Sequence, residues 1–364
     1  MELVHCTRGF HFQLKEIKCR YVLSGAGFVG KHFFPSYSLN PYRGCQHACW
    51  YCDGQFYMEH GLRLKYKFLI HDGPMDYSPE IFVKVNFPEV LVKDLAVLKT
   101  KGEITMGTTA DVYQPAESKY RLTRQILQIL RDNNFPVSIS TKSDIIVRDL
   151  DLISEISKKN WVYIEYSMTT LDEKLARLIE PGAPSPQRRL EAMKKTSEAG
   201  ILTGIWIMPW IPYITDDDEN FESIIKAAVQ NGAKFISGEV LRLREENIEH
   251  AHFMRFLRKY FPELIPKYKR LYGNRVIPDE SYILERQKRL VDLCKKYKIN
   301  YLPHFYNRKI AFRFYGSSYG RYSKHAQVLN YFVTRQLFRN MRIRFPTSDF
   351  ITRVLSILGF FPGP

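Results

Sequence analysis

Three cysteines, Cys45, Cys49 and Cys52, occupy one short segment with the spacing C-x3-C-x2-C. Cysteine thiolates are ligands of zinc and of iron–sulfur clusters. Three closely spaced thiolates can hold three corners of a [4Fe–4S] cube and leave the fourth iron for a ligand from outside the protein. With His47 as a fourth ligand, the same segment would instead complete a zinc site.

Further motifs surround these cysteines in a fixed order. They are Asn40-Pro41-Tyr42-Arg43-Gly44, the segment 107–115, Thr141-Lys142-Ser143 and the segment 180–186 with Arg188 and Arg189. Together with the aromatic Tyr51 before the third cysteine, they resemble the spore photoproduct lyase-like branch of the radical S-adenosylmethionine (radical SAM) enzymes. The resemblance covers roughly residues 36–245 and favours the iron–sulfur cluster over zinc.

The resemblance implies a cofactor pair and a reaction. A [4Fe–4S] cluster on Cys45, Cys49 and Cys52 would bind S-adenosylmethionine through its open iron. Reductive cleavage then gives a 5′-deoxyadenosyl radical that abstracts a hydrogen atom, so the cofactor carries the difficult chemistry. The electron would come from a reduced flavodoxin- or ferredoxin-like partner.

The resemblance also implies which residues contact S-adenosylmethionine. The predicted set is Tyr51, Thr108, Thr109, Asp111, Lys142, Ser167 and Arg188. A cation such as Lys142 can orient the cofactor carboxylate through a charge-assisted hydrogen bond. Simpler roles stay open: Lys142 as an exposed cation, Tyr51 as loop packing, and Arg188 as a charge near a helix terminus.

The hydrogen-atom donor departs from the family pattern. Spore photoproduct lyase returns a hydrogen atom from a cysteine just after the second core strand. The corresponding stretch here, 102–120, contains no cysteine. A threonine hydroxyl cannot replace the thiol because its O–H bond is much stronger, so Tyr113 is the candidate catalytic donor.

Apolar runs and helical periodicity alternate along the chain. Strands are predicted just before the cysteines and at 103–108, 137–141, 161–167, 202–208 and 234–240. Helices are predicted at 88–98, 121–133, 150–158, 172–178, 186–199 and 219–230. Repeated β–α units predict an α/β fold, a partial (β/α)6 TIM-like barrel with parallel strands. Chemistry in such folds gathers at the C-terminal ends of the strands, where the quoted motifs fall.

The 364 residues divide into three predicted regions. Residues 1–35 form an N-terminal extension, read as a hairpin or loop, and residues 36–245 form the radical SAM core. Residues 246–364 form a basic, aromatic and mostly helical C-terminal region.

The chain carries 54 Lys and Arg against 38 Asp and Glu, a formal charge of +16. The segment 306–348 has no acidic residue and interleaves cations with aromatic rings. Cations bind phosphates and rings stack on bases, so this region is predicted to bind DNA or RNA. A basic surface whose aromatics anchor the tail to the core would give the same pattern.

No signal peptide is evident, and the apolar segment 350–361 is too short to span a bilayer. Clustered thiols fit a reducing compartment, so a cytoplasmic location without a membrane span is predicted. The predicted function is a radical SAM enzyme, a carbon–carbon lyase of DNA-repair type that acts on nucleic acid. The alternatives are a radical SAM enzyme for a peptide or metabolite, and a non-enzymatic iron–sulfur or zinc protein that binds nucleic acid.

Overall fold

The computed structural model describes residues 3–6, 10–25, 36–52, 80–98, 101–243 and 248–301. Its main element is an eight-stranded sheet with the order β12-β11-β10-β9-β8-β7-β4-β3. Neighbours run parallel from β12 to β4, and β3 is antiparallel to β4. The strands are β3 (Ser24–Gly25), β4 (Ser36–Leu39), β7 (Glu103–Met106), β8 (Val137–Thr141), β9 (Val162–Ser167), β10 (Leu202–Trp210), β11 (Phe235–Val240) and β12 (Asn300–Tyr301).

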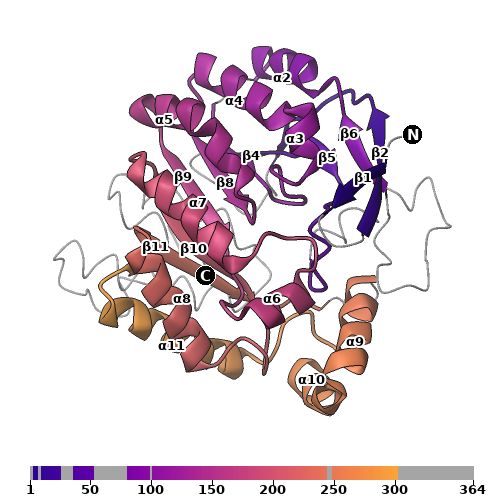
Figure 1. The fold of residues 1–364 in the computed structure, drawn as a ribbon, viewed down its shortest axis with the longest axis vertical. Coiled ribbons are helices and arrows are strands. Elements are labelled where there is room, and N and C mark those ends of the chain that lie inside the picture. The colour runs from indigo at the N-terminus through magenta and orange to yellow at the C-terminus, as the bar shows by residue number, and fades with distance from the viewer. Residues whose placement is uncertain are drawn as a thin grey trace, which may run out of the picture.

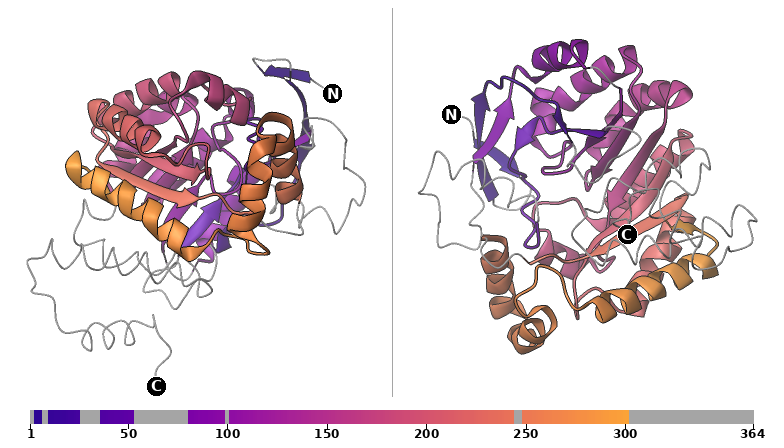
Figure 2. Two further views of the ribbon diagram at one scale, coloured as in Figure 1. Left: turned by 90° about the horizontal axis from the view of Figure 1, so that it is seen from below. Right: turned by 180° about the vertical axis from the view of Figure 1, so that it is seen from behind.

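Helices lie around the outside of this curved sheet (Figure 1). Those between or beside the parallel strands are α2 (Phe87–Ala96), α4 (Leu122–Asp132), α5 (Leu150–Lys159), α7 (Pro186–Glu198), α8 (Asp218–Gln230) and α11 (Glu280–Lys296). Shorter connecting elements are α3 (Ala116–Tyr120), η1 (Ile145–Asp149), α6 (Glu173–Ile179) and η2 (Pro262–Leu264). The helices α9 (Ile248–Tyr260) and α10 (Ile265–Tyr272) pack to one side (Figure 2).

The predicted α/β fold with a parallel sheet is confirmed, whereas closure into a partial barrel stays a prediction. The strand β8 matches its predicted bounds, and β10 continues past its predicted end to Trp210. The strand β12 was not predicted and joins the sheet from beyond residue 245. The basic segment 306–348 and the apolar segment 350–361 lie outside the described residues. No described helix is long and apolar enough to cross a membrane.

A second, four-stranded sheet adjoins the first and has the order β1-β2-β6-β5. Its strands are β1 (Leu3–Cys6), β2 (Phe10–Ile17), β5 (Tyr42–Arg43) and β6 (Glu80–Lys84). The antiparallel pair β1–β2 agrees with the hairpin expected near the N-terminus. Because β5 ends two residues before Cys45, this sheet fixes the entry to the cysteine segment.

Side chains alternate between the two faces of the main sheet, as the pleat of a strand requires. On β9, Tyr166 faces the helices, where its hydroxyl lies 2.6 Å from Thr196 Oγ1 of α7. Its neighbours Glu165 and Ser167 therefore face the concave side. Ser140 of β8 faces the same side and donates a hydrogen bond to Glu165. The concave face is thus polar, and it ends at the C-terminal edge of the sheet.

One carboxyl group makes the stability of this fold depend on pH. Glu103 is 5% exposed and accepts a hydrogen bond of 2.6 Å from Ser138 Oγ. Burial raises the pKa of Glu103 from 4.5 to about 8. In the unfolded chain the carboxyl ionises near its ordinary pKa, so stability decreases as the pH rises from that value to the folded-state pKa.

Glu103→Gln is expected to raise the free energy of unfolding by about 2 kcal/mol or more above pH 8, because each pKa unit corresponds to about 1.4 kcal/mol. Below about pH 4.5 the Glu103 carboxyl is mostly neutral in both the folded and the unfolded state, so the variant should gain little stability there. Urea unfolding across this pH range measures the effect. Equal pH slopes for the variant and the native protein would contradict it.

Candidate active site

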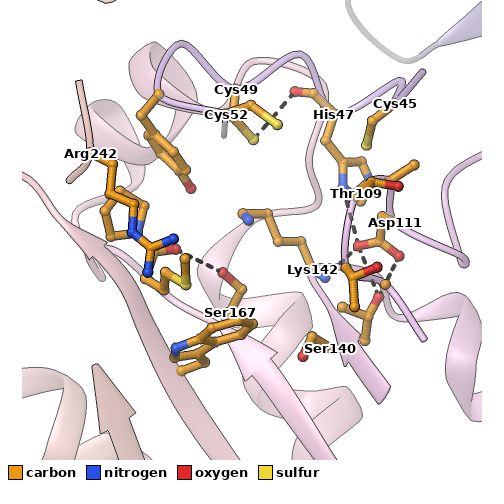
Figure 3. A pocket seen from close by; sticks show the side chains of 18 of the residues that line it. Cys45, His47, Cys49, Cys52, Thr109, Asp111, Ser140, Lys142, Ser167 and Arg242 are labelled. Atoms are coloured by element: carbon orange, nitrogen blue, oxygen red, sulfur yellow. Dashed lines mark hydrogen bonds and ion pairs between the residues drawn. The ribbon is translucent and has the colours of Figure 1, made fainter. Parts of the chain in front are cut away.

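A cavity of about 140 Å³ lies at the C-terminal ends of the parallel strands. Three thiols line it, those of Cys45, Cys49 and Cys52 (Figure 3). Also in its lining are Tyr51, Thr108, Thr109, Asp111, Lys142 and Ser167. The structure therefore brings together the predicted cluster ligands and all but one of the residues predicted to contact the cofactor.

The three thiols are largely buried, so binding as thiolates would depend on the charge of the metal. Burial raises the pKa of the Cys45 thiol to about 12, although the backbone N–H groups of Asp111 and His47 donate to its sulfur. A thiolate here needs a nearby positive charge, which an iron ion would provide. The donor set and the cavity therefore fit an iron–sulfur cluster.

The alternative zinc site needs His47 as its fourth ligand. His47 is buried, and its Nδ1 lies 3.4 Å from Asp111 Oδ2. Within the described residues, no three His, Cys, Asp or Glu side chains converge as ligands of a single metal ion. A [4Fe–4S] cube has a different requirement, since each of its cysteines binds a separate iron.

Two glutamines hold the first half of the cysteine segment. Gln114 Nε2 donates to Gly44 O at 2.9 Å, and Gln46 N donates to Gln114 Oε1 at 3.0 Å. Gln46 Oε1 in turn accepts from Ala116 N at 2.7 Å. Sequence reasoning assigned no role to either side chain, although Gln114 belongs to the motif 107–115.

The second half of the segment is held by the end of α6 and the residues after it. Trp50 N donates to Ile179 O at 3.0 Å, and Gly182 N donates to His47 O at 2.9 Å. A Cβ atom at Gly182 would lie 2.0 Å from Gln46 O, so no larger residue fits there. The motif 180–186 thus supports the cysteine segment.

A buried ion pair closes the cavity wall behind Tyr51. The Tyr51 hydroxyl donates to Glu180, which also pairs with Arg189. Both charged side chains are 1% exposed, so removal of one would leave an uncompensated buried charge. The ammonium of Lys142 lies 5.5 Å from the centre of the Tyr51 ring.

Arg188 does not reach the cavity, contrary to the sequence-based prediction. Its side chain is 56% exposed and forms an ion pair with Asp144 at 2.6 Å. Adjacent residues of a helix point in different directions, and in α7 it is Arg189 that turns inward. An exposed ion pair of this kind contributes at most about 1 kcal/mol.

Tyr113 also lies away from the cavity. Its side chain is 0% exposed in the hydrophobic core, and it does not line the cavity. This placement gives its predicted role as hydrogen-atom donor no support. The nearby Asp111 has a clear positioning role instead, because it accepts hydrogen bonds from Thr141 Oγ1 at 2.8 Å and from Lys142 N at 2.7 Å.

The wall that faces the cysteines also contains residues outside the predicted set. Trp206 lines the cavity, whereas Trp210 is fully buried in the core. Met208 also lines it, and its carbonyl accepts a hydrogen bond from Ser167 Oγ at 3.3 Å. Arg242 had no predicted role but borders the cavity and pairs with Glu239 at 2.6 Å.

Comparison with known structures agrees with this architecture. Spore photoproduct lyase in complex with a dinucleoside spore photoproduct superposes with a TM-score of 0.58 at 14% identity, over 80% of this chain and 81% of that one. At this level of identity the likeness shows a shared fold.

Sequence relatives extend over most of the chain. An uncharacterized protein of Mycobacterium tuberculosis is 31% identical over 264 residues, which cover 72% of this chain and 75% of the relative. An uncharacterized protein of Acidianus two-tailed virus is 31% identical over 273 residues, which cover 70% and 87%. The family model of the radical SAM superfamily matches residues 39–228. With its three cysteines at the mouth of a parallel α/β fold, the chain belongs to the radical SAM superfamily.

Proposed function

We propose that this protein binds a [4Fe–4S] cluster through Cys45, Cys49 and Cys52 and cleaves S-adenosylmethionine to a 5′-deoxyadenosyl radical. We propose further that the radical acts on nucleic acid in a spore photoproduct lyase-like reaction. The observation that supports the first step best is the shared cavity. Three thiols and the ammonium of Lys142 line one space at the C-terminal ends of the strands.

Lys142 is suited to hold the carboxylate of S-adenosylmethionine. Burial lowers the pKa of its ammonium, but the negative charges of Glu180 and of Cys49 in its thiolate form outweigh burial, so the net pKa is raised. The side chain therefore stays cationic at neutral pH. A charge-assisted hydrogen bond from such a fixed cation would orient the cofactor for cleavage.

The remaining groups of the cavity divide into polar and apolar contacts. Ser167 and Thr109 offer hydroxyl groups next to Lys142, while Trp206, Met208 and Val240 form an apolar wall. An apolar wall excludes water and protects a reactive radical from side reactions. The cluster supplies the electron when bound, and the protein supplies position and shelter.

The nucleic-acid substrate is supported by charge. The chain has a formal charge of +16, which favours binding of polyanions. Cys19 and Cys294, which lie outside the cluster segment, do not line the cavity. Return of the hydrogen atom would therefore rely on a group other than these two thiols.

Anaerobic reconstitution with iron and sulfide is expected to give an oxygen-sensitive protein that releases 5′-deoxyadenosine when dithionite or reduced flavodoxin is added. Cys49→Ala should abolish this release, because the cluster loses one of its three ligands. Chromatography of the products and iron analysis measure both effects. Cys294→Ala, at a buried cysteine outside the cavity, is the control and should retain the activity. Full activity of Cys49→Ala would refute the ligand assignment.

Lys142→Met is expected to weaken binding of S-adenosylmethionine roughly 10- to 100-fold, since a hydrogen bond between charged groups contributes about 1.5–3 kcal/mol. The iron content of the reconstituted variant should not change, because Lys142 is not a cluster ligand. Equilibrium dialysis with labelled cofactor measures the affinity. Lys101→Met, at an exposed lysine outside the cavity, is the matched control. Unchanged cofactor affinity in Lys142→Met would remove Lys142 from the proposed site.

A further inference from the structure

Tyr213 is an exposed aromatic residue near the cavity that the proposed reaction does not use. It lies in the loop after β10, four residues beyond Pro209, which lines the cavity. Its side chain is 43% exposed, and among the described aromatic residues only Tyr21 is also strongly exposed. An extended chain spans at most about 3.5 Å per residue, so the Cα atoms of Tyr213 and Pro209 lie within roughly 14 Å of each other.

The position of the Tyr213 ring is fixed by its neighbours. It packs edge-on against Tyr268, with ring centres 6.1 Å apart, and is tilted against Tyr282 at 5.9 Å. The backbone N–H of Tyr213 donates to Asp216 Oδ1 at 2.7 Å, and the Tyr282 hydroxyl donates to the same carboxylate. These contacts hold the ring at the surface before any ligand binds.

The backbone of Tyr213 has an unusual conformation that the same contacts maintain. Its φ angle is +63°, in the left-handed region that most side chains disfavour. Asparagine tolerates this region better than other residues with a Cβ atom. A replacement by asparagine can therefore remove the ring without adding backbone strain.

Cationic side chains surround the ring. The Lys267 ammonium lies 5.5 Å from the ring centre, and the guanidinium groups of Arg270 and Arg286 are close enough to act electrostatically on the Tyr213 hydroxyl. Lys267 and Arg270 are exposed on α10. The nearby carboxylate of Asp216 is 5% exposed and already accepts hydrogen bonds, so the accessible charge beside the ring is positive.

We propose that Tyr213, together with Lys267 and Arg270, is a stacking platform for an unpaired base of a nucleic-acid strand that also enters the cavity. Aromatic side chains stack on bases of any sequence, and neighbouring cations bind the phosphates that flank them. This inference rests on the proposed nucleic-acid substrate. The platform would hold a nucleotide that lies near the nucleotide on which the radical acts.

The test measures binding of the reconstituted protein to short fluorescent oligothymidylate and oligouridylate by anisotropy. Tyr213→Asn is expected to weaken binding roughly five- to 100-fold, the usual loss when a stacking ring is removed. Tyr213→Phe keeps the ring and should bind within about twofold of the native protein. Tyr21→Asn, at an exposed tyrosine on another part of the surface, is the matched control and should bind like the native protein.

Salt dependence tests the two cations. Lys267→Gln and Arg270→Gln should each lower the slope of log affinity against log salt by about one, because each loses about one phosphate contact. The two oligonucleotides distinguish a DNA strand from an RNA strand. Release of 5′-deoxyadenosine without oligonucleotide should not change in any of these variants, since none alters the cavity.

Two results would overturn the platform, and they differ in what else they overturn. If the native protein binds oligonucleotides and Tyr213→Asn binds them equally well, the platform is wrong while the nucleic-acid substrate stands. If the native protein binds neither oligonucleotide, the nucleic-acid substrate fails and the platform fails with it. Cleavage of S-adenosylmethionine would stand in both cases.

Discussion

The structure depends on one constraint: the cysteine segment is largely buried but has little regular secondary structure. Buried backbone groups need hydrogen-bond partners, and a segment of this kind cannot provide them from a helix or a sheet. The side chain of Gln114 supplies partners on one side, and the backbone of Ile179 and Gly182 supplies them on the other. The motifs that surround the cysteines in the sequence are therefore mainly parts of one scaffold that presents three thiols to the cavity.

A second constraint is the balance of charge around the cavity. Lys142 and Arg189 are cations in a region with little water, where an unpaired charge is costly. Glu180 compensates both, by an ion pair with Arg189 and by its electrostatic effect on Lys142. Because Glu180 also accepts a hydrogen bond from Tyr51, the charge balance and the position of the cysteine segment are coupled. The charge of the cation that lines the cavity is thus balanced by the same group that accepts the hydrogen bond from Tyr51.

Much of the fold and of the site could be predicted from the sequence, for reasons that particular residues make clear. Apolar runs between turn residues located the strands β7 to β11, and parallel topology then placed Lys142 and Ser167 at one edge. Arg188 and Arg189 could not be told apart, because the inward face of α7 is set by its packing on the sheet. The same difficulty arose in the loop that contains Tyr113 and Gln114, because the sequence does not show which of these two side chains faces the cysteine segment. The strand β12 is too short to show any periodicity.

Polar side chains on the concave face of the sheet explain why hydrophobic periodicity in the sequence could not identify the residues that line the interior. In a closed barrel this space is filled by layers of branched apolar side chains. Here Glu165 lies between Ser140 and Ser237, whose hydroxyls donate to it, and burial raises its pKa to about 7. Glu103 lies lower on the same face and has a pKa of about 8. Both carboxyls weaken folding when they ionise, so this side of the sheet keeps polar groups beside the cavity at a cost in stability that an apolar core would avoid.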